Sequence, residues 1–171
     1  RQTGKTSSPD FVGGLSTTFE AYGFDLTVQT ALQLGGYVYD SNYVGLMTPG
    51  DAGQNFHKDM FNRWTPTNTD TNIPALGYQM QSQTINNGNY VDFFLTDASY
   101  FSLRNITLGY TLPKNWLQKA GIEKLRVYLT GDNIWLQSKR KGLDPRYDFT
   151  GSTNFSYSAL STYSIGLNLT L

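Results

Sequence analysis

Residues 155–171, FSYSALSTYSIGLNLTL, alternate between apolar and polar side chains along their whole length. The odd-numbered positions are aromatic or aliphatic, with Ser161 as the polar exception, and the even-numbered positions are small or polar, with Leu160 as the apolar exception. A period of two residues predicts a β-strand with one apolar and one polar face. Strands of soluble sheets usually run about five or six residues, whereas a strand that crosses a bilayer needs about 9–11. The pattern therefore predicts a strand of a transmembrane β-barrel.

The composition agrees with this prediction and excludes several other classes of protein. The 171 residues are 39% hydrophobic and 15% aromatic, with a net charge of zero and no cysteine. A membrane helix needs about 20 consecutive apolar residues, and no such run occurs, whereas the hydropathy of barrel strands averages out along the chain. Zero net charge argues against a nucleic-acid partner. The absence of cysteine removes disulfides and thiol ligands.

Four upstream segments show the same alternation and are predicted to be strands. They cover residues 11–21, 24–34, 100–112 and 125–135. A tight turn at Tyr22-Gly23 joins the first two, because glycine tolerates a positive φ. Pro113 ends the third strand, since proline cannot donate to a ladder. Residues 114–120 are predicted to form a short helix that ends at Gly121.

Two long polar connections separate these strands. Residues 40–99 and 138–154 lose the alternation and are rich in polar residues. The longer connection is unusual for a compact soluble domain, whereas outer-membrane barrels have short turns on one side and long loops on the other. The sequence thus predicts an all-β fold, a segment of an antiparallel transmembrane barrel with about five strands and long extracellular loops.

A series of short motifs follows in order along nearly the whole chain. The motifs are RWTP at 63–66 followed by IP at 73–74, NITLGYTLP at 105–113, LRVY at 125–128, GDN at 131–133 and KGLDP at 141–145. In combination they resemble the C-terminal end of SusC/RagA-type transporters, TonB-dependent outer-membrane proteins that import glycans or peptides. Ser164, Gly166, Leu169 and Leu171 resemble the barrel-assembly signal of such proteins. One departure is that the family usually ends in an aromatic residue, whereas this chain ends in Leu171.

The resemblance implies a barrel of about 22 strands around a plug, nutrient import across the bacterial outer membrane, and three partners: TonB, a SusD-like surface lipoprotein and outer-membrane lipid. Five strands would leave two open edges, which a bilayer does not tolerate. The chain also begins at Arg1 without a signal peptide. We therefore expect residues 1–171 to be a single C-terminal barrel segment of a longer protein, whose other part holds the plug, the remaining strands and the segment that engages TonB.

The sequence offers little for catalysis or for a cofactor. His57 is the one histidine and has no evident cluster of metal partners. Asn68, Asp70 and Asn72 lack the glycine and closing glutamate of an EF-hand, so turn formation explains them better. Asp92 and Asp97 have no fixed separation that would make them a glycosidase pair. We expect neither an enzyme nor a cofactor.

Aromatic residues in the long connection are candidates for contact with a ligand or with the lipoprotein lid. Such rings combine an apolar face with a polar tip and stack on sugars. The candidates are Tyr43, Phe56, His57, Trp64 and Tyr78. The alternative is that they pack the connection against its neighbours. A second function also stays open, a stand-alone β-sheet module that binds carbohydrate through residues 40–99.

The parity of the last strand predicts its orientation. Tyr163, Ile165, Leu167 and Leu169 should face lipid, and Thr162, Ser164 and Asn168 should face the lumen. Residues 113–124 then form a periplasmic turn, and residues 40–99 lie on the extracellular side.

Overall fold

A computed structural model describes residues 4–47, 53–75, 92–118, 121–139, 142–147 and 158–171. The chain divides into two compact units. The sheet unit comprises residues 8–35, 98–144 and 157–171, and the loop unit comprises residues 1–7, 36–97 and 145–156.

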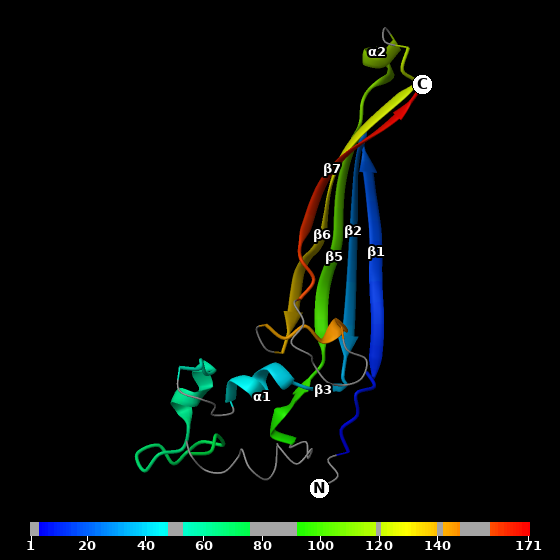
Figure 1. Cartoon of the computed structure of the whole chain (residues 1–171). Coiled ribbons are helices and arrows are strands. Elements are labelled where there is room, and N and C mark those ends of the chain that lie inside the picture. Colours follow the sequence, from blue (N-terminus) through cyan, green and yellow to red (C-terminus); the bar gives the residue numbers. More distant parts are fainter. Residues whose placement is uncertain (1–3, 48–52, 76–91, 119–120, 140–141, 148–157) are drawn as a thin grey trace. The chain divides into compact units, whose positions relative to one another are not determined.

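Five long antiparallel strands form the sheet unit (Figure 1). They are β1 (Phe11–Ala21), β2 (Phe24–Leu34), β5 (Tyr100–Thr111), β6 (Lys124–Ser138) and β7 (Thr162–Thr170). Their order in the sheet, β1-β2-β5-β6-β7, follows their order along the chain, and each pair is antiparallel. The prediction of an antiparallel all-β segment is therefore confirmed. β6 has 15 residues, far more than the five or six of a usual strand.

The short connections at one end of the sheet agree with their sequence signals. Tyr22 and Gly23 have φ values of 52° and 86°, which is the pattern of a two-residue type I′ turn. The predicted helix at 114–120 is shorter in the structure, because α2 (Lys114–Leu117) ends with Gln118 as its C-cap. Gly121 has a φ of 69° and its amide donates to the carbonyl oxygen of Gln118. Residues 119–120 lie outside the described part of the chain.

The last strand begins later than its sequence pattern indicates, so the predicted strand over residues 155–171 is wrong at residues 158–161. β7 begins at Thr162, which pairs with Asp132 of β6, and residues 158–161 are not in a strand. Asn133, next along β6, has a φ of 51°, and its carbonyl oxygen accepts a 2.7 Å bond from the Ser161 hydroxyl. The bend at Asn133 therefore ends the regular ladder at Thr162. Residues 155–157 lie outside the described residues.

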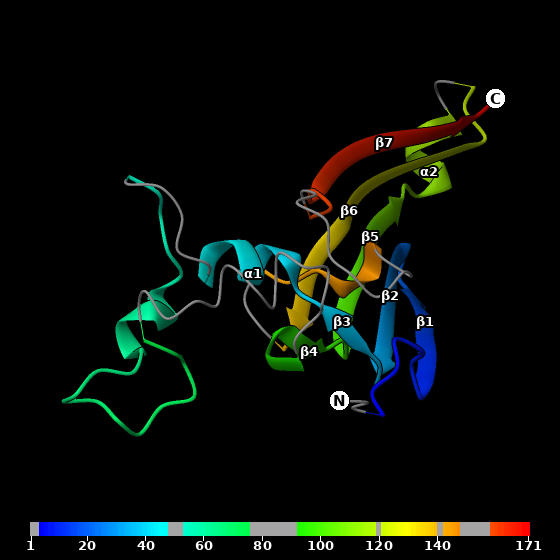
Figure 2. The same cartoon turned by 60° about the horizontal axis from the view of Figure 1, so that its bottom comes forward.

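The loop unit has a small core of its own, which the loss of alternation over residues 40–99 did not predict. Its elements are β3 (Tyr37–Tyr39), α1 (Ser41–Met47), η1 (Lys58–Asn62), η3 (Asp92–Phe94), β4 (Leu95–Asp97) and η5 (Pro145–Tyr147). β3 and β4 pair as a two-stranded antiparallel sheet. Among the described residues, the buried cluster is formed by Tyr39, Met47, Met60, Ile73 and Phe94. Figure 1 labels β3 and α1 of this unit, and Figure 2 also labels β4.

Across the parts of the chain that the structure describes, none of the helices has the length and apolar character needed to span a membrane.

Candidate functional site

One face of the five-stranded sheet is apolar across its full width. The strand registers place Phe19, Leu26, Leu108, Leu129 and Ile165 in one row, with one residue from each strand. These side chains are not buried: Phe19 is 62% exposed and Ile165 is 74% exposed. Soluble monomers rarely expose a contiguous apolar surface of this kind. The face therefore suits the hydrocarbon interior of a bilayer.

Aromatic pairs lie toward both ends of this apolar face. Phe24 and Tyr110 have ring centroids 4.5 Å apart near the turn between β1 and β2, and Phe101 and Trp135 have centroids 6.0 Å apart toward the other end. Tyr110 follows Phe101 by nine positions along β5, which corresponds to about 30 Å of strand. A strand tilt of about 35–45° would reduce this to about 21–25 Å along the bilayer normal, close to the apolar band of outer-membrane barrels, about 25 Å.

A bulge explains why the sequence pattern did not reveal the second aromatic pair. The register of β5 shifts between Leu103 and Asn105, so that Arg104 has no strand partner. A bulge inserts one residue and reverses the parity of the strand beyond it. Odd-numbered Phe101 therefore lies on the same face as even-numbered Tyr110, which simple alternation would place on opposite faces.

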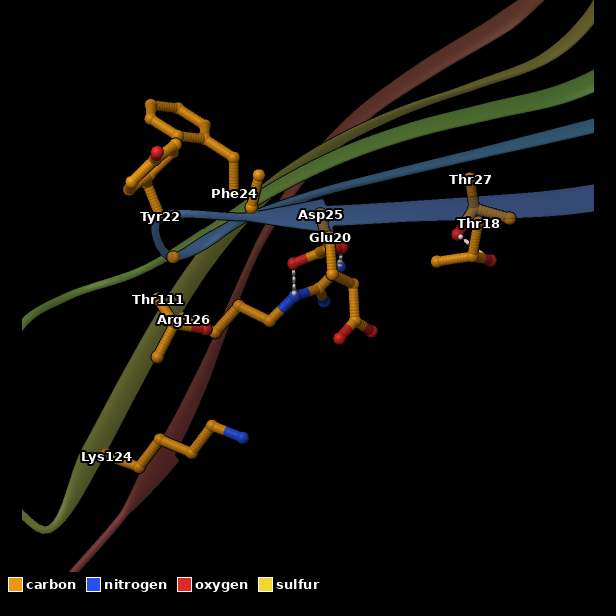
Figure 3. Close-up of a pocket in the computed structure, with 11 residues that line it drawn as sticks. Thr18, Glu20, Tyr22, Phe24, Asp25, Thr27, Thr111, Lys124 and Arg126 are labelled. Atoms are coloured by element: carbon orange, nitrogen blue, oxygen red, sulfur yellow. Dashed lines mark hydrogen bonds and ion pairs between the residues drawn. The ribbon is translucent and has the colours of Figure 1, made fainter.

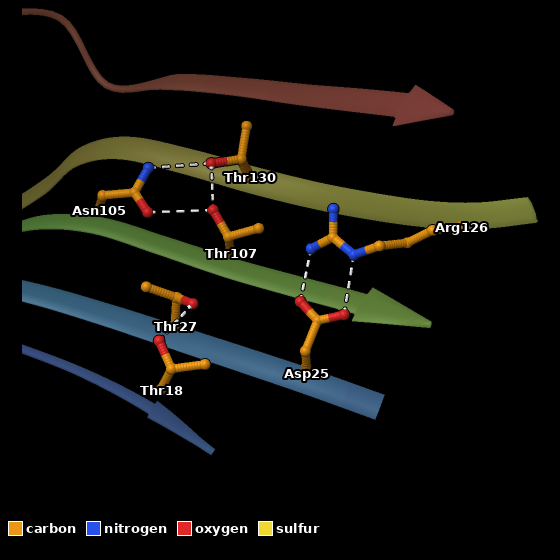
Figure 4. A network of polar contacts seen from close by, with 7 residues as sticks. All are labelled: Thr18, Asp25, Thr27, Asn105, Thr107, Arg126 and Thr130. Carbon is orange, nitrogen blue, oxygen red and sulfur yellow. Dashed lines mark hydrogen bonds and ion pairs between the residues drawn. The ribbon is translucent and has the colours of Figure 1, made fainter. Parts of the chain in front are cut away.

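The other face of the sheet carries a polar network (Figure 4). The amide of Asn105 donates to Thr130 at 2.9 Å and to Asp132 at 2.7 Å. Thr107 donates to Asn105 at 3.0 Å and lies 2.8 Å from the hydroxyl of Thr130. Thr18 and Thr27 are linked in the same way between β1 and β2. Such cross-strand pairs each stabilise a sheet by roughly 0.2–1 kcal/mol.

An ion pair on the polar face joins two strands that are not neighbours. Arg126 of β6 donates from Nε to Asp25 of β2 at 2.8 Å and also donates from Nη2 to the second carboxylate oxygen. β5 runs between these strands, and a Cβ at its Gly109 would overlap both charged groups. The bidentate pair is a strong form of contact. Gly109 therefore provides the space in which β2 and β6 are bridged across β5.

This ion pair borders an open cavity of about 570 Å³ (Figure 3). The lining also includes Glu20 and Lys124, so acidic and basic side chains are balanced. No cluster of three or more His, Cys, Asp or Glu residues that could hold a metal ion occurs within the described residues. The lining is therefore polar and charge-balanced, which does not favour an apolar ligand.

Two glycine–aromatic contacts link β6 and β7, one on each face. Tyr128 of β6 pairs with Gly166 on the polar face, and its ring occupies the place of a Cβ at Gly166. Tyr163 of β7 pairs with Gly131 on the apolar face, where a Cβ would lie 3.1 Å from the ring. The structure therefore gives Gly166, a residue of the resembled assembly signal, a packing role.

The other residues of that signal are split between the two faces. Ser164 pairs with Thr130 on the polar face, and Leu169 pairs with Leu125 on the apolar face. Leu171 follows the end of β7 and is 84% exposed. Their role in assembly stays a prediction.

Tyr43 and His57, two of the candidates for ligand contact, meet in the loop unit. Their ring centroids are 4.9 Å apart in an edge-to-face arrangement. The Tyr43 hydroxyl donates to Asp59 Oδ2 at 2.9 Å, and the Asp59 amide donates to His57 Nδ1 at 3.2 Å. Burial, together with the hydrogen bond to the Asp59 carboxylate, raises the pKa of Tyr43 to about 12.

A second cavity, of about 390 Å³, opens beside this cluster. Tyr43, Asp59, Asn62, Asn72, Ile73 and Phe93 line it. Tyr43 alone among these was a sequence candidate. The others were missed because they come from three separated segments, and only the fold of the loop unit brings them together.

His57, Phe56 and Trp64 are not among the residues that line that cavity. Phe56 and Trp64 are 44% and 43% exposed, and the Trp64 amide donates to Ile73 at 2.8 Å. Tyr78 lies outside the described residues. Asn68 closes a turn, because its amide donates to both the carbonyl and the hydroxyl oxygen of Thr65 at 3.0 Å.

Known proteins resemble this chain over nearly all of its length. It is 29% identical over 173 residues to "TonB-dependent receptor P3" of Formosa agariphila, covering 95% of this chain and 16% of the receptor. It is 31% identical over 171 residues to "TonB-dependent receptor SusC" of Bacteroides thetaiotaomicron, covering 96% of this chain and 15% of SusC. The chain thus spans about a sixth of the length of these relatives. No protein-family model matches the chain.

The fold of the chain is also similar to that of solved structures. The RagAB peptide importer in its open-open state superposes with a TM-score of 0.79 at 27% identity, covering 98% of this chain and 18% of the matched one. A structure of the RagAB peptide transporter superposes with a TM-score of 0.80 at 28% identity, covering 96% and 18%.

Proposed function

Since the chain belongs to the SusC/RagA type of TonB-dependent receptors, we propose that it forms part of the barrel wall of an outer-membrane nutrient importer driven through TonB. The observation that carries this proposal is the apolar face of the sheet, which is continuous from β1 to β7 and bounded by aromatic pairs. Its polar face would line the lumen.

The chain would supply only part of that barrel. β1 and β7 are the edges of the described sheet, and an unpaired edge in lipid leaves backbone groups without hydrogen bonds. Further strands of the same protein would pair with these edges to close a barrel of about 22 strands. In this proposal residues 1–171 are one C-terminal segment, and the plug and the TonB-engaging segment belong to the rest of the protein.

The loop unit would serve substrate capture on the extracellular side. Its chain leaves the sheet after β2 and returns at β5, at the sheet end opposite the Tyr22-Gly23 turn. A surface lipoprotein of the SusD type would act as a lid, and the loop unit would contact it. RagAB is described as a peptide importer, so peptides are candidate substrates beside the glycans that the family resemblance implies.

The alternative of a stand-alone carbohydrate-binding module is less well supported. Such a module would bury one face of its sheet in its own core. Here Leu129, Ile165 and Leu167 are 56–74% exposed. The sheet is therefore better suited to lipid than to water.

A deletion and complementation experiment tests the importer. The gene for the full-length protein is deleted, and growth is measured on single glycans and on peptide mixtures as the sole nutrient. We expect growth on one nutrient class to fail, to return with the wild-type gene, and to fail again in a strain without TonB. Normal growth on every nutrient after deletion would contradict the proposal.

A second experiment tests the role of the loop unit. Removal of residues 47–83 from the full-length protein should leave the barrel assembled but abolish lipoprotein association or uptake. Barrel assembly is measured by resistance to denaturation in detergent, and association by copurification. Normal association together with normal uptake would refute the assigned role.

A further inference from the structure

We propose that the cavity of about 390 Å³ in the loop unit is a binding site for one sugar unit of a neutral oligosaccharide. This inference rests on the proposed import function and names the substrate class that its loop unit would capture. The volume falls within the range of about 300–1,000 Å³ that is usual for small-molecule pockets.

The polar lining suits vicinal hydroxyl groups. Asp59, Asn62 and Asn72 line the cavity, and they offer a carboxylate and two amides. A sugar hydroxyl both donates and accepts hydrogen bonds. Two neighbouring hydroxyls can therefore bind the two polar atoms of one carboxylate or one side-chain amide. Asp59 is already held in place, because the Tyr43 hydroxyl donates to its Oδ2. Its Oδ1 is then the acceptor available to a ligand.

The apolar lining suits the ring of a sugar. Phe93 and Ile73 line the same cavity, and the rings of Phe93 and Tyr43 are inclined by only 25° with centroids 6.4 Å apart. An aromatic ring offers a broad apolar face, against which the C–H groups of a pyranose can pack. The cavity thus combines an apolar wall with convergent hydrogen-bonding groups.

The cavity walls are fixed by the core of the loop unit. Phe94, next to Phe93, is fully buried, and Ile73 and Met60 are 7% and 9% exposed. The rings of Phe93 and Phe94 are in edge-to-face contact with centroids 5.0 Å apart. Groups that are ordered before binding reduce the entropy that is lost on association. The site is therefore suited to a ligand that makes only a few hydrogen bonds.

The charge of the lining narrows the ligand class. Among the described residues of the lining, Asp59 is the one that carries a charge, so an anionic sugar or a free carboxylate would be repelled. A peptide could direct a cationic group to Asp59, but it would not offer the adjacent hydroxyls that suit Asn62 and Asn72. A neutral carbohydrate can bind the polar groups of the lining with its hydroxyls and pack its ring against the apolar wall.

The test measures binding to the purified full-length protein in detergent. The probes are an array of neutral plant, algal and animal oligosaccharides and a library of octapeptides that includes lysine-rich members. We expect a neutral oligosaccharide to bind, with affinity reduced about tenfold to a hundredfold in Asp59→Asn and in Asn72→Ala, the range for a lost hydrogen bond in a binding site. The matched controls are Asp70→Asn and Asn55→Ala, which change exposed residues outside the cavity lining and should leave affinity unchanged.

Several outcomes would overturn the inference. Binding of peptides alone, or of no oligosaccharide, refutes the ligand class. Oligosaccharide binding that is insensitive to both cavity variants refutes the site. Asn72→Ala changes an exposed side chain, so it still tests the site if Asp59→Asn disturbs folding. Binding does not require TonB or uptake, so a protein that binds sugar but is dispensable for growth would overturn the import function alone.

Discussion

The two units of this chain place their apolar side chains in opposite ways. In the loop unit, Phe94 is fully buried and Met47 is 2% exposed, as in any water-soluble core. In the sheet unit, the apolar face is open, and Ile165 is 74% exposed. The loop unit is stabilised by contacts among its own residues, whereas the sheet of the proposed barrel would depend on backbone ladders and on a surrounding apolar medium.

The contrast shows that burial alone does not measure how much a residue matters in this molecule. In the proposed barrel, an exposed leucine of the sheet would avoid water through contact with lipid, whereas a buried methionine of the loop unit avoids water through contact with protein. The cost of a substitution should therefore depend on protein packing in the loop unit and on the surrounding medium in the sheet unit.

The largest effect is expected in the core of the loop unit. Phe94→Ala should destabilise that unit by about 3–5 kcal/mol, because the large buried ring is replaced by a cavity. Hydrogen exchange of residues 36–75, read by mass spectrometry, would report the loss of protection. Phe61→Ala, at a residue that is 89% exposed, is the control and should change stability by less than about 0.5 kcal/mol. Equal effects of the two variants would show that the core does not stabilise the unit.

The next largest effect is expected on the lipid side of the sheet. Ile165→Arg should cost about 2–4 kcal/mol if this side chain lies near the middle of the bilayer, whereas Ser164→Arg, on the other face of the same strand, should cost much less. Urea unfolding from lipid vesicles measures both. If the two costs are equal, the assignment of the two faces is wrong.

Much of the sheet was predictable from sequence because strand alternation is local. The turn at Tyr22-Gly23 and the end of β5 before Pro113 needed only adjacent residues. The start of β7 did not, because it depends on the bend at Asn133 in another strand. The candidate site was harder to predict from sequence than the sheet. Tyr43 was a candidate from its residue type, but Asn62, Asn72 and Phe93 join it only through the tertiary packing of the loop unit.

A moderate effect is expected where β6 and β7 meet. Gly166→Ala should destabilise the sheet by about 1–3 kcal/mol, the usual cost of overpacking, because the Tyr128 ring occupies the space of the new methyl group. In the double variant Gly166→Ala with Tyr128→Ala this clash is absent. We therefore expect a favourable interaction term in the double-mutant cycle. Simple additivity of the two costs would mean that Tyr128 and Gly166 are not packed against each other.

The smallest effect is expected at Tyr43. Tyr43→Phe removes the hydrogen bond to Asp59 and should cost the loop unit about 1 kcal/mol at neutral pH, measured by hydrogen exchange as for Phe94→Ala. The hydroxyl has a pKa of about 12 in the folded chain and about 10 when unfolded, so its neutral form is favoured by folding. The contribution is therefore complete below about pH 10 and is lost as the pH rises toward 12. The difference in tyrosinate absorbance between wild type and Tyr43→Phe should accordingly titrate near pH 12. A titration near pH 10 would show that Tyr43 is neither buried nor bonded to Asp59, and the cavity beside it would then lack the fixed carboxylate on which sugar binding depends.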